Sequence, residues 1–180
     1  MISDAYKAEQ QRLHATNPYY GVASVEFAPK VSNLVNALGI KQILDYGAGK
    51  GRLGQSLDLN HPATITLYDP GIPGLDEIPE PHEMVCCIDV LEHIEPEYLD
   101  AVLDDLQRVT KRIGFFTIHT GPAVKVLSDG RNAHLTQQGP EWWLPKLMAR
   151  FELHNYTRVS DNGFLVIVCP LVPTSASETQ

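Results

Sequence analysis

The periodicity of apolar residues changes repeatedly along this chain between the pattern of strands and the pattern of amphipathic helices. Residues 84–90 form a run that is apolar except for Asp89 and that suits a strand buried on both faces of a parallel sheet. Residues 31–38 instead carry apolar side chains three and four apart, the spacing of one helix face. The alternation predicts an α/β fold with a mostly parallel twisted sheet of six to seven strands, helices on both faces and a C-terminal antiparallel hairpin. The expected strands are 41–46, 64–68, 84–90, 113–118, 152–159 and 163–168, and the expected helices cover 3–14 and 31–38, begin near 52 and 96, and run from Pro140 through Phe151.

Length and composition fit one globular domain. The chain has 180 residues, of which 43% are hydrophobic and 20% are charged, which is typical of folded rather than disordered proteins. We expect residues 27–170 to form this domain, with an N-terminal flap or helix over residues 1–26 and a polar tail over residues 171–180.

Charge and cysteine content restrict the partners and the compartment. A net charge of −8 disfavours a duplex nucleic acid, because its phosphates would be repelled. Cys86, Cys87 and Cys169 lie in apolar runs and are expected to be buried, reduced thiols. The sequence has no signal-peptide core and no apolar window of the roughly 18 residues that a membrane span needs. We therefore expect a cytoplasmic protein with no membrane partner, and the oligomeric state stays open.

A glycine-rich turn follows directly on one of the expected strands. Residues 43–51 read Ile-Leu-Asp-Tyr-Gly-Ala-Gly-Lys-Gly. Glycines let the backbone turn tightly and approach a ligand more closely than side chains would allow. Asp69 ends the next expected strand, where a carboxylate can accept hydrogen bonds from both hydroxyls of a ribose. Because open α/β sheets bind ligands at the carboxyl ends of strands, the turn and the carboxylate predict a nucleoside-binding pocket.

The chain contains three landmarks in order: the motif Asp45-x-Gly47-x-Gly49-x-Gly51, the acid Asp69, and the run Asp89-Val90-Leu91-Glu92-His93. Together they resemble class I S-adenosylmethionine-dependent methyltransferases, over roughly residues 27–168. The resemblance implies a single Rossmann-like methyltransferase domain that binds S-adenosylmethionine and methylates a small-molecule or nucleotide-like acceptor. Two alternatives stay open. One is a non-catalytic S-adenosylmethionine-binding subunit that needs a partner, and the other is a nicotinamide-dependent reductase, which the Gly-x-Gly-x-Gly spacing disfavours.

The resemblance also implies roles for the pocket residues. Asp45 and Gly47 would lie near the methionine part of the cofactor, Asp69 would hold the ribose, and Pro70 and Ile72 would flank the adenine. The full set implied for cofactor binding is Asp45, Tyr46, Gly47, Ala48, Gly49, Gly51, Asp69, Pro70, Asp89 and Val90. The chain departs from the family in one place, because only residues 70–83 join two strands that the family usually separates by a helix and a further strand.

Histidines supply the candidates for a base that takes a proton from the acceptor. His93 and His119 follow expected strands, and His134 lies in a long loop. We expect the catalytic residues to come from Glu92, His93 and His134. The alternative for each histidine is a hydrogen-bonded structural role.

The same residues suggest a metal site as an alternative. Asp89, Glu92 and His93 fall at i, i+3 and i+4, on one side of a helical turn. This spacing resembles the metal-binding acid-x-x-Glu-His motif of small-RNA 3′-end methyltransferases and of ubiquinone-pathway O-methyltransferases. His134 of this chain could supply a fourth ligand. A divalent ion there would orient an acceptor hydroxyl. The run equally resembles metal-free methyltransferases, and we expect S-adenosylmethionine alone as cofactor.

Two further segments are expected to border the acceptor. Residues 120–139 show no regular apolar spacing and are expected to form a long loop, of the kind that is usually either a functional lid or disordered. Tyr20-Gly21 resembles the N-terminal flap of small methyltransferases. Trp142 and Trp143, with Tyr19 and Tyr20, could stack on a planar acceptor, but we expect one tryptophan to pack in the core and the other to cover the surface.

Overall fold

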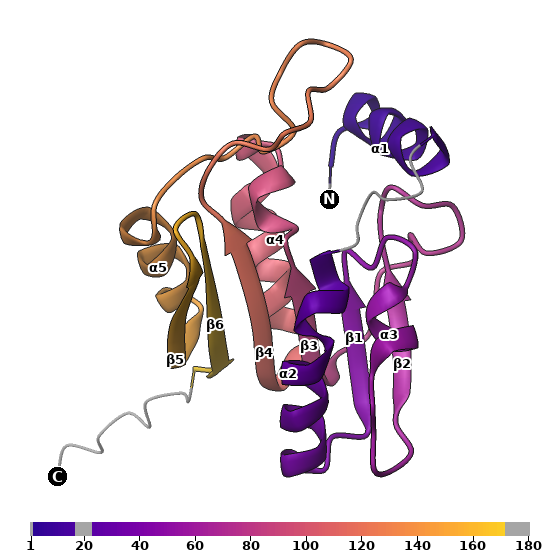
Figure 1. Ribbon diagram of the computed structural model, residues 1–180, viewed down its shortest axis with the longest axis vertical. Helices are drawn as coiled ribbons and strands as arrows, with labels where there is room; N and C mark the ends of the chain where they lie inside the picture. The colour runs from indigo at the N-terminus through magenta and orange to yellow at the C-terminus, as the bar shows by residue number, and fades with distance from the viewer. Residues whose placement is uncertain (1, 17–22, 172–180) are drawn as a thin grey trace, which may run out of the picture.

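The computed structural model describes residues 2–16 and 23–171 and contains one sheet (Figure 1). Its six strands lie in the order β2-β1-β3-β4-β6-β5. The parallel part consists of β1 (Gln42–Tyr46), β2 (Thr64–Tyr68), β3 (His82–Ile88) and β4 (Thr110–His119). The hairpin of β5 (Phe151–Ser160) and β6 (Gly163–Pro170) joins β4 in antiparallel orientation. The predicted α/β fold, with a mostly parallel sheet and a terminal hairpin, is confirmed.

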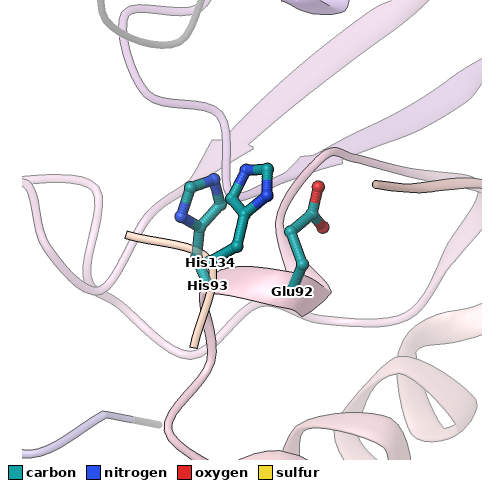
Figure 2. Close-up of side chains that lie close together, drawn as sticks. All are labelled: Glu92, His93 and His134. Atoms are coloured by element: carbon teal, nitrogen blue, oxygen red, sulfur yellow. The ribbon is translucent and has the colours of Figure 1, made fainter. Parts of the chain in front are cut away.

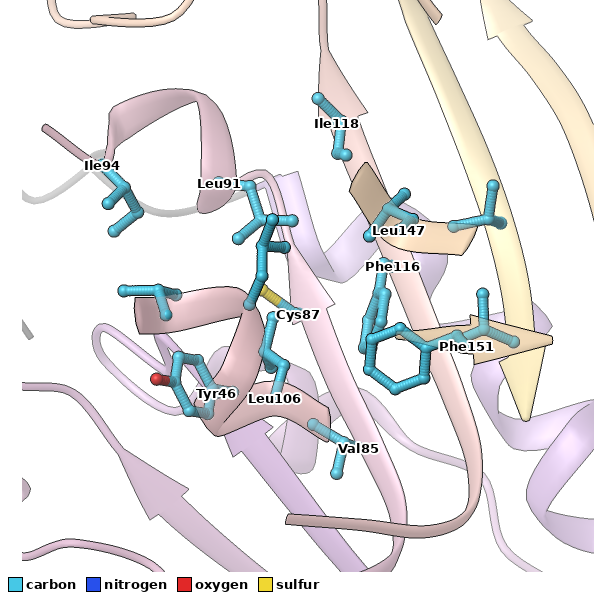
Figure 3. Packing of buried hydrophobic residues seen from close by; sticks show 14 of the residues in the cluster. Tyr46, Val85, Cys87, Leu91, Ile94, Leu106, Phe116, Ile118, Leu147 and Phe151 are labelled. Atoms are coloured by element: carbon cyan, nitrogen blue, oxygen red, sulfur yellow. The ribbon is translucent and has the colours of Figure 1, made fainter. Parts of the chain in front are cut away.

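Two apolar clusters, one on each face of the sheet, form the core. Helices α2 (Ala23–Leu38) and α3 (Arg52–Ser56) pack on one face, and α4 (Pro96–Val109) and α5 (Pro140–Met148) pack on the other. Successive side chains of a strand point to opposite faces, so Cys86 lies in the first cluster and Cys87 in the second. Figure 3 shows the second cluster, in which Cys87 packs near Leu106 of α4. Helices on both faces are therefore confirmed, and β3 is buried from both sides.

Several element ends differ from the prediction: α2 begins before residue 31, β3 ends at Ile88 and not at Val90, and α5 ends before Phe151. The apolar spacing places Phe151 on the helix that begins at Pro140, but α5 ends at Met148 and Phe151 opens β5. Phe151 is 1% exposed and packs edge-on against Phe116 of β4, with the ring centroids 5.4 Å apart. It thus belongs to the same buried cluster as Leu147, which explains why its spacing resembles that of the helix. Trp143 is fully buried and Trp142 partly buried, as predicted.

The segments that come after the parallel strands gather at one edge of the sheet. Figure 1 shows α1 (Asp4–Thr16) and the loop of residues 120–139 at this edge, at the top of the view. Tyr6 and Leu13 of α1 pack against Leu127 and Ala133 of the loop. The predicted N-terminal helix is confirmed, and it lies over the edge where the sequence places the pocket.

Some predictions fall outside the described residues. Tyr19, Tyr20 and Gly21, expected to form a flap, and the tail beyond residue 171 are among them. The boundaries proposed at residues 26, 27 and 170 stay predictions. Among the described helices, none has both the length and the apolar character needed to cross a membrane.

Candidate functional site

Hydrogen bonds hold the glycine-rich turn of residues 47–51, here called the glycine turn, against the end of β2. The backbone N–H groups of Gly47 and Ala48 donate to the carbonyl oxygen of Tyr68, at 2.8 and 3.0 Å, and Gly49 N–H donates to Asp69 Oδ2 at 2.9 Å. Gly47 has φ +78°, and a Cβ built there would lie 2.4 Å from Val90 Cγ2. A side chain at this position would therefore be both strained and obstructed. The turn and Asp69 adjoin each other, as the predicted pocket requires.

A cavity of about 550 Å³ opens beside this turn. It extends from Asp69 past Asp45 to His93, and α1 and the 120–139 loop border it on the far side. The residues predicted from the sequence that line it are Asp45, Gly47, Ala48, Gly49, Asp69, Pro70, Asp89, Val90, His93, His119 and His134.

Four of the named residues are not among those that line this cavity. Tyr46 points into the core on the other side of β1 from Asp45, because adjacent strand residues face opposite ways. Its hydroxyl donates to Asp105 Oδ2 at 2.9 Å, and burial raises the pKa of Tyr46. Gly51 caps the start of α3, and Ile72 lines a separate depression on the outer side of the turn. Glu92 is fully buried behind the cavity wall.

Asp45 is a buried carboxylate, and one of its oxygens accepts no hydrogen bond from the described residues. It is 3% exposed, and its Oδ2 has no hydrogen-bond partner among the described residues. Burial, and next the nearby charge of Asp69, raise the pKa of Asp45 to about 7. The carboxylate of Asp69 accepts from Gly49 N–H and, at 2.8 Å, from Gly71 N–H. The cavity thus presents an acceptor in Asp45 that a donor on a ligand, such as an ammonium group, can satisfy.

Glu92, His93 and His134 come together at the other end of the site. Figure 2 shows their three side chains, from the short helix η1 (Leu91–His93) and from the 120–139 loop. One ligand atom from each lies within 4.8 Å of the others. The rings of His93 and His134 are 4.7 Å apart, and that of His119 lies 4.8 Å from His134. Loop and sheet edge thus combine to build a histidine cluster that borders the cavity.

Backbone carbonyls orient two of these rings. His93 Nδ1 lies 2.8 Å from the carbonyl oxygen of Ala133, and His134 Nδ1 lies 2.7 Å from that of Gly121. A carbonyl oxygen can only accept, so both Nδ1 atoms carry the proton and both Nε2 atoms carry the lone pair. Burial lowers the pKa of His93 to about 4 and also lowers that of His134. Both imidazoles are therefore neutral near pH 7 and are able to accept a proton or bind a cation.

The acidic residues around this cluster differ in their environments. Glu92 Oε1 accepts from the backbone N–H of His119 at 3.0 Å, whereas its Oε2 has no hydrogen-bond partner within the described ranges. Burial, and then the charge of Asp89, raise the pKa of Glu92 well above its ordinary value. Asp89 accepts from Thr117 Oγ1 at 2.6 Å. Its carboxylate is not part of the group of close ligand atoms.

The helical turn expected to align Asp89 with Glu92 and His93 is not formed. The turn begins only at Leu91, and Asp89 has φ +51°, so the chain bends between Asp89 and Glu92. Thr117 stabilises this bend, because its hydroxyl donates to the Asp89 carboxylate and accepts from the Asp89 backbone N–H.

The sequence predicts an N-terminal flap or helix, but it did not identify which residues of that segment line the cavity. Ile2, Tyr6 and Gln10 line the cavity, as do Lys125 and Ala133 of the loop. The spacing of four between Ile2, Tyr6 and Gln10 was the only signal, because α1 is otherwise mostly polar.

Solved structures provide the comparison with known proteins. The 1,6-didemethyltoxoflavin-N1-methyltransferase of Burkholderia thailandensis, solved with S-adenosylhomocysteine, is 17% identical over 92% of this chain and 87% of that chain, with a TM-score of 0.66. The N-methyltransferase NodS of Bradyrhizobium japonicum, also with S-adenosylhomocysteine, is 13% identical over 91% and 98%, with a TM-score of 0.61. The magnesium protoporphyrin IX methyltransferase of Synechocystis is 13% identical over 90% and 93%, with a TM-score of 0.58. No protein-family model matches the chain, and no curated protein matches it in sequence. The likeness confirms the Rossmann-like methyltransferase fold.

Proposed function

We propose that this chain, which has the fold of S-adenosylmethionine-dependent methyltransferases, binds S-adenosylmethionine and methylates a small-molecule or nucleotide-like acceptor. The observation that carries the proposal is one cavity that joins the bare backbone at Gly47, the buried Asp45 Oδ2 without a described partner, and the carboxylate of Asp69. Asp45 suits the ammonium group of the methionine part, and Asp69 suits the ribose hydroxyls. Ala48, Gly49, Pro70, Asp89 and Val90 complete the wall of this cofactor site.

The histidine cluster provides the acceptor end of the site. S-adenosylmethionine supplies a methyl group on a positively charged sulfur, so the chain has to align the acceptor and accept the proton that it loses. His93 and His134 line the cavity and present neutral imidazoles. When bound, S-adenosylmethionine would give its methyl group to the acceptor and leave as S-adenosylhomocysteine, and the Nε2 atom of one of these imidazoles would take the proton that the acceptor loses.

Calorimetry tests this proposal. We expect one S-adenosylhomocysteine or S-adenosylmethionine molecule to bind per chain and NADH to give no signal. Methyl release on addition of candidate acceptors separates an enzyme from a binding subunit. Binding of NADH in place of S-adenosylhomocysteine would instead support the nicotinamide-dependent reductase.

A divalent cation is a second candidate for how the acceptor is activated, and the buried Glu92 Oε2 favours it. A carboxylate buried without a donor is costly unless it is protonated or bound to a cation. Two imidazoles and one carboxylate suit a borderline ion such as Zn²⁺ or Co²⁺. Backbone carbonyls that hold the Nδ1–H groups are the usual support for such ligands. When bound, the ion would polarise an acceptor hydroxyl.

Titration with Co²⁺ distinguishes the cation from a protonated Glu92. If Glu92, His93 and His134 bind a cation, the visible absorption of Co²⁺ will saturate at one ion per chain, and Glu92→Gln and His134→Ala will each lower the affinity by about tenfold or more. His154→Ala, which removes an exposed histidine of β5, serves as the control and should leave the titration unchanged. Equal titrations for all four proteins would reject the metal site and leave the metal-free reaction in place.

A further inference from the structure

The face of helix α1 that points toward the cavity carries a polar side chain, that of Gln10. Tyr6 and Gln10 both line the cavity, and residues four apart lie on the same side of a helix. Tyr6 is 3% exposed and Gln10 is 9% exposed, whereas Asp4, Ala5, Ala8 and Arg12 are exposed. A glutamine buried on the inward face of a surface helix is unusual, because packing alone would be served by an apolar residue.

Gln10 lies at the end of the cavity that contains Asp69. A Cβ built on Gly71 would come within 2.9 Å of Gln10 Cβ and 3.2 Å of Asp69 Oδ1. The backbone N–H of Gly71 is the group that donates to Asp69 Oδ1. The bare backbone of Gly71 therefore lets α1 approach the turn that carries Asp69, and it brings the stem of Gln10 close to that carboxylate.

Polar contacts to three separate segments fix the orientation of α1. Ser3 donates from its backbone N–H and its hydroxyl to the carboxylate of Glu95, at 2.8 and 2.7 Å. Lys7 pairs with Asp76 at 2.9 Å. Ser128 donates from its N–H and hydroxyl to Glu9, at 3.0 and 2.9 Å. Contacts on both sides of the helix prevent it from rotating, so the inward face is determined by the fold.

We propose that Gln10 is a cofactor-binding residue whose side-chain amide contacts the nucleoside part of the ligand beside Asp69. This inference rests on the proposed function, which places an adenosine at that end of the cavity. An amide offers both a donor and an acceptor, which matches ribose hydroxyls and the edge of an adenine. α1 thereby completes the cofactor site from the side opposite the glycine turn.

Calorimetry with S-adenosylhomocysteine and with adenosine tests the assignment. Gln10→Met keeps most of the side-chain volume and removes the amide, so it separates hydrogen bonding from packing. We expect Gln10→Met to weaken both probes by a factor of roughly 3 to 10, the effect of one neutral hydrogen bond. Gln107→Met, near the C-terminal end of α4 and outside the cavity lining, is the matched control and should bind both probes like the unchanged chain.

The outcomes separate this inference from the proposed function. If the unchanged chain fails to bind S-adenosylhomocysteine, the proposed function is wrong. If the unchanged chain binds S-adenosylhomocysteine and Gln10→Met binds both probes as tightly as the unchanged chain does, only the assignment of Gln10 is overturned. A loss seen with S-adenosylhomocysteine but not with adenosine also overturns it, because the contact would then be to the amino-acid part.

Discussion

Replacement of Asp69 by alanine is expected to weaken S-adenosylhomocysteine binding by roughly 100-fold or more. Two charge-assisted hydrogen bonds to ribose hydroxyls would be lost, and each contributes about 1.5–3 kcal/mol. The same carboxylate also accepts hydrogen bonds from Gly49 N–H and Gly71 N–H. The substitution therefore also removes the contacts that hold the glycine-rich turn and the segment after β2 in place. Calorimetry on the variant and the unchanged chain measures the effect directly.

A matched acidic substitution in the same segment provides the control. Glu77 is exposed, and Glu77→Ala removes the same charge without touching the cavity. We expect its affinity for S-adenosylhomocysteine to stay within about twofold of the unchanged chain, since an exposed charge at a distance is screened by salt. An Asp69→Ala variant that binds as well as Glu77→Ala would show that the ligand does not use this end of the cavity.

The fold was predictable because the apolar pattern of a buried strand is local. In β3, successive residues such as Cys86 and Cys87 must be apolar on both faces, so the run of apolar residues is visible without knowledge of any partner strand. Helix α4 shows the complementary pattern, with Leu99, Leu103 and Leu106 on one buried face. Phe151 misled the prediction because burial on α5 and burial on β5 require the same apolar side chain.

The part of the cavity beside the glycine-rich turn was also visible in the sequence, because its residues lie at or directly after the ends of strands. Asp45 and Asp69 stand at the ends of neighbouring parallel strands, and parallel strands end at the same edge. The parts that were not predictable depend on contacts between segments that are distant in the sequence. Gln10 and Tyr6 reach the cavity only because Glu95, Asp76 and Ser128, distant in sequence, hold α1 there. The bend at Asp89, which separates its carboxylate from Glu92, depends on Thr117, in β4.

Gly47→Ala is expected to destabilise the fold by about 2–4 kcal/mol and to weaken S-adenosylhomocysteine binding. Two effects combine at this position. The backbone has φ +78°, which an alanine adopts only with strain, and the new Cβ would lie 2.4 Å from Val90 Cγ2 and 2.9 Å from Cγ1. Either Val90 or the turn has to move, and both line the cavity. Urea unfolding gives the free energy, and calorimetry gives the affinity.

Two further variants separate backbone strain from the steric clash. Gly74 has φ +87°, and a Cβ placed on it would meet nothing within 4 Å, so Gly74→Ala measures strain alone, expected at about 1 kcal/mol. Val90→Ala removes both Cγ atoms and leaves the Cβ of residue 90 at 3.2 Å from the Cβ of an alanine at position 47. The double variant Gly47→Ala with Val90→Ala should therefore lose less stability than the sum of the losses of the two single variants. If the two losses of stability add strictly, the clash with Val90 does not cause the destabilisation of Gly47→Ala. The absence of a side chain at Gly47 would then serve the conformation of the turn and not the close approach of Val90.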